Sequence, residues 1–475
     1  MPNDPNLDDT PQSSREGRAH PVPTGATAAT ATGRGTRREI VAWAMYDWAN
    51  SAYSTLLITV LYFYISTLFP SPEHKDAAFP VVYLGETVVQ GPVVYAWGIG
   101  LSMLVAAILS PIVGALADAR ANKRLWFRST ALAGALLGTT IGLISPHSPW
   151  LVLGCFVLAS FCFELSFGFY NSFLPEIADE ITMNRVSSWG FAAGYIGGGV
   201  VLAMALGLMT AGDRLGLDSL SARMRASLVL MGCWWALFSM PAIWILRDRG
   251  RPRSSAVGFR AAAHQAVGEV ATTLGHIRQF QSLAWFLIGF LFYNDAVQTV
   301  LTQSSAFAEK EIGLNVRQLI PVILMIQFVS MPGALAVGWL ADKIGQKQAL
   351  YLCLAVWVAL LSFSWWVTTE NEFWIMGAVV ALVMGGIQSV SRSIMGVMTP
   401  ANRTAEFFGF YNLSSKATSF IGPFTFGLVI HLTGSARLAI LSLLAQLIIG
   451  WLLVSRVNIA RGRADAIRAS EATTQ

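Results

Sequence analysis

Long apolar stretches separated by short polar ones fill the chain from residue 39 onward. A helix needs about 20 mostly apolar residues to cross a bilayer. Stretches of this kind occupy 40–69, 92–117, 125–145, 149–173, 188–211, 225–246, 281–305, 318–341, 348–368, 372–398, 406–431 and 435–456. The longest polar interruption, 247–280, divides them into two equal groups. The pattern predicts an all-α integral membrane protein with twelve transmembrane helices in two six-helix pseudo-repeats.

The polar segments suggest how the chain is organised around these helices. Residues 1–33 are rich in Pro, Thr, Ala, Gly and Ser and contain no apolar run, a composition typical of disorder. The expected segments are a disordered cytoplasmic tail (1–38), an N-terminal bundle (39–246), a cytoplasmic linker (247–280), a C-terminal bundle (281–456) and a cytoplasmic tail (457–475).

Lys and Arg are unequally divided between the two sides of the predicted membrane. If the N-terminus is inside, the linker RDRGRPR and the C-terminal Arg residues lie on the same side as the N-terminal ones. Cytoplasmic loops carry an excess of Lys and Arg, so both termini are expected in the cytoplasm. The chain is 54% hydrophobic and 12% charged, and its net charge of +5 is spread over loops. We therefore expect the protein to lie in a lipid bilayer and to bind no nucleic acid.

Several kinds of chemistry find no support in the sequence. The four cysteines lie inside apolar stretches without CxxC spacing, so neither a disulfide framework nor a zinc site is expected. The chain contains no GxxxxGK[ST], HExxH or GxSxG motif. We expect no cofactor, no metal site, no catalytic residues and no enzymatic activity.

The two halves of the chain carry related residues at a constant offset. Asp118 and Asp342 are 224 positions apart, and so are Gly198 and Gly422. Parallel repeats of this kind build transporters in which a central site lies between two rocking bundles.

The loops GALADARANKR (114–124) and GWLADKIGQKQ (338–348) occupy equivalent places in the two repeats. A glycine lets two helices approach closely, and an aspartate can pair with a base or lie at a helix N-terminus. Such contacts can hold the cytoplasmic side closed; the alternative is a static loop cap. The predicted gating residues are Gly114, Asp118, Arg120, Lys123, Arg124, Gly338, Asp342, Lys343 and Lys347.

The first of these loops resembles the cytoplasmic loop signature of the major facilitator superfamily. WAMYDWANSAY (43–53), YNSFLPEIA (170–178), YNDAVQTV (293–300), QSVSRS (388–393) and EFFGFYN (406–412) resemble the vacuole effluxer family of autophagy-related permeases within it. The resemblance implies twelve helices and solute transport, with amino-acid efflux known for the fungal vacuolar branch. Because the family has many bacterial members, it also implies the bacterial cytoplasmic membrane. We expect a monomer.

Strongly polar residues lie within several predicted spans. An ionised side chain there costs at least about 2.5–3.5 kcal/mol on insertion scales, so it is a candidate for function. Asp47 in the first span and Asp295 in the seventh occupy related places in the two repeats. The candidates for solute binding or coupling are Asp47, Asn50, Glu164, Asn171, Asn294, Asp295, Gln298, Gln388, Asn412 and Lys416.

The depth of each polar residue within its predicted span suggests a role for it, and each role has an alternative. Asp295 or Glu164 would carry a proton, and Lys416 with the Asn50 face would contact a solute. Asp47 would fasten the cytoplasmic end of the first helix within a packed network. Alternatively, Asp295 and Lys416 form a structural pair. Arg392, near a cytoplasmic helix end, is expected to extend its guanidinium to the membrane interface.

The leading functional hypothesis is a secondary active transporter that moves a small polar solute by alternating access, driven by a solute or proton gradient. One buried cation and one buried carboxylate would suit a zwitterionic amino acid. The alternatives are a membrane scaffold or receptor that keeps the fold without transport, and an efflux carrier for drug-like or other metabolites.

Overall fold

The computed structural model describes residues 35–69, 82–84, 87–89, 91–250, 259–275, 277–314, 316–416 and 421–472. The N-terminal half contains α1 (Arg37–Leu56), a π-helical turn (Leu57–Leu61), α2 (Tyr62–Leu68), α3 (Gly91–Arg120), α4 (Lys123–Leu143), α5 (Pro149–Ser172), α6 (Leu174–Ile177), α7 (Met183–Ala211), a 3₁₀ turn (Gly212–Leu215) and α8 (Leu220–Ile245). The strands β1 (Val82–Leu84) and β2 (Thr87–Val89) form an antiparallel pair with Tyr83 opposite Val88.

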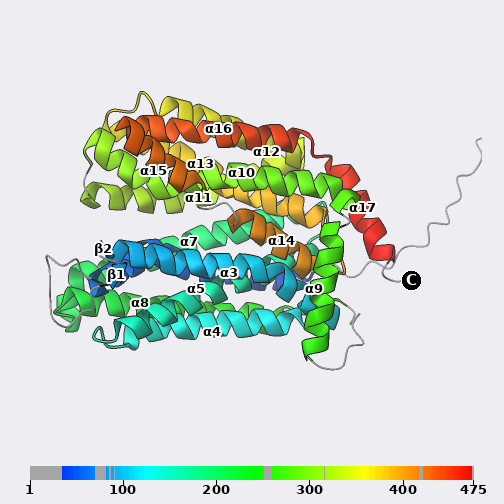
Figure 1. Ribbon diagram of the computed structural model, residues 1–475, viewed down its shortest axis with the longest axis horizontal. Coiled ribbons are helices and arrows are strands. Elements are labelled where there is room, and N and C mark those ends of the chain that lie inside the picture. Colours follow the sequence, from blue (N-terminus) through cyan, green and yellow to red (C-terminus); the bar gives the residue numbers. More distant parts are fainter. Residues whose placement is uncertain are drawn as a thin grey trace, which may run out of the picture. The chain divides into compact units, whose positions relative to one another are not determined.

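The C-terminal half repeats this helical plan (Figure 1). It contains α10 (Gln281–Phe307), a π-helical turn (Ala308–Ile312), α11 (Val316–Ile344), α12 (Gln346–Phe363), α13 (Glu370–Val397), α14 (Thr404–Lys416), α15 (Ile421–Thr433) and α16 (Ala436–Ser455). Between the halves lie α9 (Phe259–Gly275) and a 3₁₀ turn (Ile277–Phe280), and α17 (Ile459–Ala472) follows α16. The helices α9 and α17 lie in the segments expected as linker and tail.

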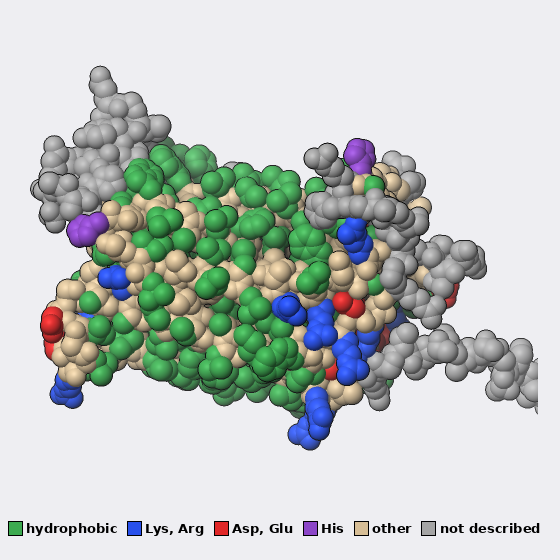
Figure 2. Space-filling view, turned by 90° about the horizontal axis from the view of Figure 1, so that it is seen from below, with side chains coloured by type: hydrophobic (Ala, Val, Ile, Leu, Met, Phe, Trp, Pro, Cys, Tyr) green, Lys and Arg blue, Asp and Glu red, His purple; other side chains and the backbone are tan. Residues whose placement is uncertain are grey.

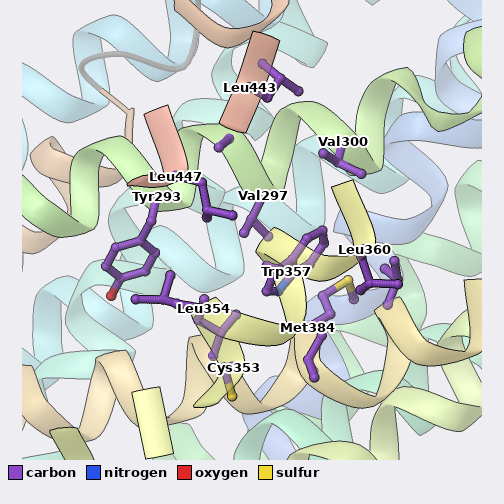
Figure 3. Packing of buried hydrophobic residues seen from close by; sticks show 14 of the residues in the cluster. Tyr293, Val297, Val300, Cys353, Leu354, Trp357, Leu360, Met384, Leu443 and Leu447 are labelled. Atoms are coloured by element: carbon purple, nitrogen blue, oxygen red, sulfur yellow. The ribbon is translucent and has the colours of Figure 1, made fainter. Parts of the chain in front are cut away.

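Each half has its own hydrophobic core. In the N-terminal half, α1 packs against α7 and α8, and α4 packs against α5 and α8. In the C-terminal half, α10 packs against α16 and α11 packs against α13. Figure 3 shows part of the second core, where Val297 of α10, Trp357 of α12 and Leu447 of α16 approach one another. The two halves are thus packed largely as two bundles, each around its own core.

Ten helical segments in the described part of the chain are long and apolar enough to cross a membrane. The predicted span 125–145 forms α4, which begins with the charged residues Lys123 and Arg124 and is not among these ten segments. The predicted span 406–431 includes α14, α15 and residues 417–420, which lie outside the described part of the chain. The count of twelve therefore stays a prediction. Figure 2 shows hydrophobic side chains over the middle of one face and Lys and Arg gathered toward one end.

The two halves meet along helix pairs that are equivalent in the repeats. Helix α3 packs against α14, and α7 packs against α11. Glycines make both approaches possible: a Cβ on Gly114 would lie 2.3 Å from the carbonyl oxygen of Ala405, and one on Gly338 would lie 1.8 Å from Ser188 Oγ. Both are closer than the van der Waals contact distance, so a larger residue would force the helices apart.

Candidate functional site

The first inter-half contact lies at what we call the basic end, the end of the helices that carries Lys123, Arg124, Lys343, Lys347 and Arg403. Asp118 Oδ2, near the end of α3, accepts a hydrogen bond from the backbone N–H of Glu406 at 2.9 Å. Glu406 lies in the first turn of α14, where the helix dipole favours a carboxylate. This contact joins the N-terminal half to the C-terminal half.

The equivalent loop of the second repeat makes a related contact. Asp342 Oδ1 accepts a hydrogen bond from Asn184 Nδ2 at 2.9 Å, and Arg185 Nε lies 3.9 Å from its other oxygen. Asn184 and Arg185 lie in the first turn of α7. In both repeats the loop aspartate thus lies beside the first turn of a helix from the other half.

The basic residues of the two loops differ in what they join. Lys123 is buried; it forms an ion pair with Glu176 of its own half and donates to Thr404 Oγ1 of the other half at 2.7 Å. Arg124 donates to backbone carbonyls at the end of α8, and Lys347 donates to those at the end of α16. Lys343 lies over the ring of Trp339. Arg120 is half-buried and has polar contacts of its own.

A further inter-half contact is an ion pair deep between the bundles. Arg392 Nη1 on α13 lies 3.3 Å from Asp47 Oδ2 on α1, and the two residues are 1% and 4% exposed. Arg392 also donates to Asn171 Oδ1 at 3.1 Å and to the backbone oxygen of Ser187 at 2.6 Å. The hydroxyl of Tyr170 donates to Asp47 Oδ2 at 2.9 Å. The guanidinium does not reach the membrane interface, so that prediction for Arg392 is wrong.

A further ion pair within the predicted spans also joins the halves. Lys416 Nζ on α14 lies 3.1 Å from Glu164 Oε1 on α5. Asn412, one turn before Lys416, donates to the backbone oxygen of Glu164 at 3.1 Å. The alternative that paired Lys416 with Asp295 is therefore wrong.

One face of α5 brings these contacts together. Glu164, Gly168 and Asn171 follow the i, i+4, i+7 spacing of a single helix face. Glu164 meets Lys416, and Asn171 meets Arg392. In these two ion pairs the acid belongs to the N-terminal half and the cation to the C-terminal half, whereas Arg185–Asp342 at the basic end has the opposite polarity.

Other predicted residues lie within the C-terminal half. Asn294 and Gln388 line a small cavity with Tyr293 and Ser391, whose hydroxyls are 2.7 Å apart, and the cavity is too narrow to hold a water molecule. Gln298 is half-buried.

Two of the predicted site residues carry a buried polar atom that has no hydrogen-bond partner among the described residues. One is Asp295 Oδ1; the other oxygen of Asp295 accepts from the backbone N–H of Gly422, in the first turn of α15, at 2.8 Å. The second is Asn50 Nδ2 on α1, one turn beyond Asp47. No group of His, Cys, Asp and Glu that could hold a metal ion occurs in the described part of the chain.

Comparison with known proteins identifies the relatives of this chain. Residues 35–467 match the model of the family described as vacuole effluxer Atg22 like. An uncharacterized MFS-type transporter, YxiO, of Bacillus subtilis is 30% identical over 87% of this chain and 94% of its own. Autophagy-related protein 22 of Cryptococcus neoformans is 26% identical over 62% of this chain and 56% of its own.

A solved structure shares the fold. The proton:xylose symporter XylE, of the major facilitator superfamily, superposes with a TM-score of 0.67 at 13% identity, over 91% of this chain and 98% of its own. With the matched family model, this shows a multi-pass membrane protein with the fold of that superfamily. The chain belongs to the vacuole effluxer Atg22-like family of major facilitator superfamily transporters.

Proposed function

We propose that the protein is a secondary active transporter that moves a small polar solute, such as an amino acid, by alternating access. The observation that carries the proposal is a set of two inter-half ion pairs within the predicted spans, Asp47–Arg392, which is buried, and Glu164–Lys416, whose acid is buried. Both join the same two bundles with the same polarity. They accompany contacts that close the basic end, so the structure suits a state closed on that side.

The ion pairs suggest how a solute would take part. When the halves separate, each pair loses its partner, and an unpaired charge in a low-dielectric interior is strongly unfavourable. A solute with a positive and a negative group would satisfy the acids of one half and the cations of the other. This supports a zwitterionic amino acid as the substrate class.

Proton coupling is the simplest energy source for such a cycle. Glu164 is one candidate for carrying the proton, because its partner Lys416 leaves with the other half. Asp295 is the second candidate, since one of its oxygens has no partner among the described residues. A carboxylate that takes up a proton when its partner leaves would couple solute movement to the gradient.

The same proposal includes the orientation of the protein, its membrane and its oligomeric state. The basic end would face the cytoplasm, the protein would lie in a bacterial cytoplasmic membrane as a monomer, and the bundles 39–246 and 281–456 would rock about the interface between them.

The test is solute exchange in proteoliposomes that contain the purified protein. Vesicles loaded with unlabelled amino acids are expected to accumulate labelled amino acid from outside, and an imposed pH gradient is expected to change the initial rate. Lys416→Ala should abolish exchange, whereas Gly207→Ala, with open space around its Cβ position, should not. If folded protein exchanges no amino acid of a broad panel, the proposed substrate class is wrong.

A further inference from the structure

We propose that the N-terminal half carries a subsite for an organic cation, the ammonium or guanidinium group of a solute. Arg392 of the C-terminal half would fill this subsite while the basic end is closed. The inference deepens the transport function proposed above and rests on it. We call the subsite the Arg392 box; it consists of Trp43, Asp47, Tyr170, Asn171, Ser187 and Phe191.

The polar side of the box offers hydrogen-bond acceptors. Asn171 Oδ1, Ser187 Oγ and the Ser187 backbone oxygen accept from the guanidinium at 3.1, 3.0 and 2.6 Å. Asp47 Oδ2 adds a negative charge at 3.3 Å. Cations donate hydrogen bonds and anions accept them, so this arrangement selects a positively charged group.

The apolar side of the box consists of three aromatic rings. The guanidinium carbon of Arg392 lies 4.0 Å from the ring centre of Phe191, 4.8 Å from that of Trp43 and 5.5 Å from that of Tyr170. Aromatic faces attract cations, and cages of such rings are used to recognise organic cations. The box thus has the chemistry expected for an ammonium or guanidinium ligand.

The box belongs to one half only, because its residues come from α1, α5 and α7. Contacts within that half hold it together: Trp43 stacks on Tyr170 and donates to its backbone oxygen at 2.9 Å. The guanidinium comes from α13 of the other half. The box would therefore remain assembled when α13 moves away.

A glycine on α7 leaves the space that the cation fills. A Cβ on Gly190 would lie 2.7 Å from the ring of Trp43, 2.7 Å from the hydroxyl of Tyr170 and 2.8 Å from Arg392 Nη2. By contrast, a Cβ on Gly207 of the same helix would meet nothing within 4 Å. Gly190→Ala and Gly207→Ala therefore form a matched pair, of which only the first narrows the box.

Exchange of cations follows from the movement of the halves. When α13 withdraws, the buried carboxylate of Asp47 loses its counter-ion. A positive group of the solute can then replace the guanidinium, and it leaves again when Arg392 returns. The side chain of Arg392 would thus compete with the solute for the same box.

The test uses full-length Arg392→Ala protein in detergent, with methylguanidinium chloride as the probe and sodium chloride at equal ionic strength as the reference. We expect a saturable rise in melting temperature with methylguanidinium and with methylammonium, and none with sodium acetate. The native protein should respond at about tenfold higher probe concentration, because its own guanidinium occupies the box.

Adding Gly190→Ala to Arg392→Ala should weaken binding about tenfold, whereas adding Gly207→Ala should not. If Arg392→Ala is monodisperse only when methylguanidinium is present during purification, that rescue also supports the box. No saturable shift, no monodisperse protein even with the probe, or equal binding by the two glycine variants would overturn it. Since binding is measured without transport, this result is independent of the solute-exchange experiment.

Discussion

At the residue scale, the Asp47–Arg392 pair is the most completely buried charge pair between the halves. Removing one partner of a buried pair leaves an uncompensated charge, whereas removing both charges leaves none. If the bundles separate as proposed, Asp47 and Arg392 each lose their counter-ion. Water, protonation or a solute would then have to offset the cost of the unpaired charges.

Arg392→Gln is expected to destabilise the protein by about 3–5 kcal/mol, because Asp47 remains buried without its cation. The double variant Asp47→Asn with Arg392→Gln is expected to recover much of this loss. Melting temperatures in one detergent measure the difference. Equal stability of the single and double variants would contradict the energetic role of the pair.

Glu164→Gln is expected to have a smaller effect, about 1–3 kcal/mol. The reason is that the Lys416 side chain is 22% exposed and therefore less desolvated than that of Arg392, which is 1% exposed. The same melting experiment ranks the two variants. A loss for Glu164→Gln as large as that for Arg392→Gln would contradict this ranking.

The sequence shows that Asp47, Glu164 and Lys416 are charged residues within apolar runs. It does not show which of these charges pair with one another. The i, i+4, i+7 spacing of Glu164, Gly168 and Asn171 was available in the sequence as a sign of one polar face. Arg392 was misjudged because its distance from a helix end does not reveal which side of the helix it occupies. Only packing of α13 against the other half shows that.

At the element scale, the close approaches of α3 to α14 and of α11 to α7 depend on Gly114 and Gly338. These approaches place Asp118 and Asp342 beside helix starts of the other half. The paired loops were recognisable from their common offset in the chain. The partners of α14 across the interface were not recognisable, because a hydropathy pattern does not show which helices meet.

Gly338→Ala is expected to open the basic end, because its Cβ would overlap Ser188 Oγ. Spin labels at the exposed positions Arg128 and Lys343, in protein lacking its native cysteines, report the separation of the halves. We expect a longer mean distance for Gly338→Ala and an unchanged one for Gly207→Ala. Unchanged distances in both would show that this contact does not hold the end closed.

At the scale of the whole molecule, two further helices join the halves at the basic end. Thr273 of α9 donates to Glu406 of α14 at 2.8 Å, while α9 also packs against α3. Arg463 of α17 forms an ion pair of 2.7 Å with Glu180, which precedes α7. Neither helix was foreseen, because polar amphipathic segments outside the membrane do not stand out in a hydropathy pattern.

Arg463→Ala alone is expected to change stability by at most about 1 kcal/mol, because both partners of its ion pair are about half exposed. Deletion of residues 459–475 removes the packing of α17 as well and is expected to lengthen the Arg128–Lys343 label distance. If the deletion leaves that distance unchanged, α17 does not help to close the basic end.

The central claim is that the two halves must separate at this interface for a solute to cross. Ser188 Oγ of α7 and Ser389 Oγ of α13 are 2.9 Å apart across it. We therefore expect Ser188→Cys with Ser389→Cys, in protein lacking its native cysteines, to form a disulfide on oxidation that stops amino-acid exchange in proteoliposomes. Reductant should restore exchange, and the single cysteine variants should be unaffected by either treatment. Full exchange by completely cross-linked protein would contradict the account.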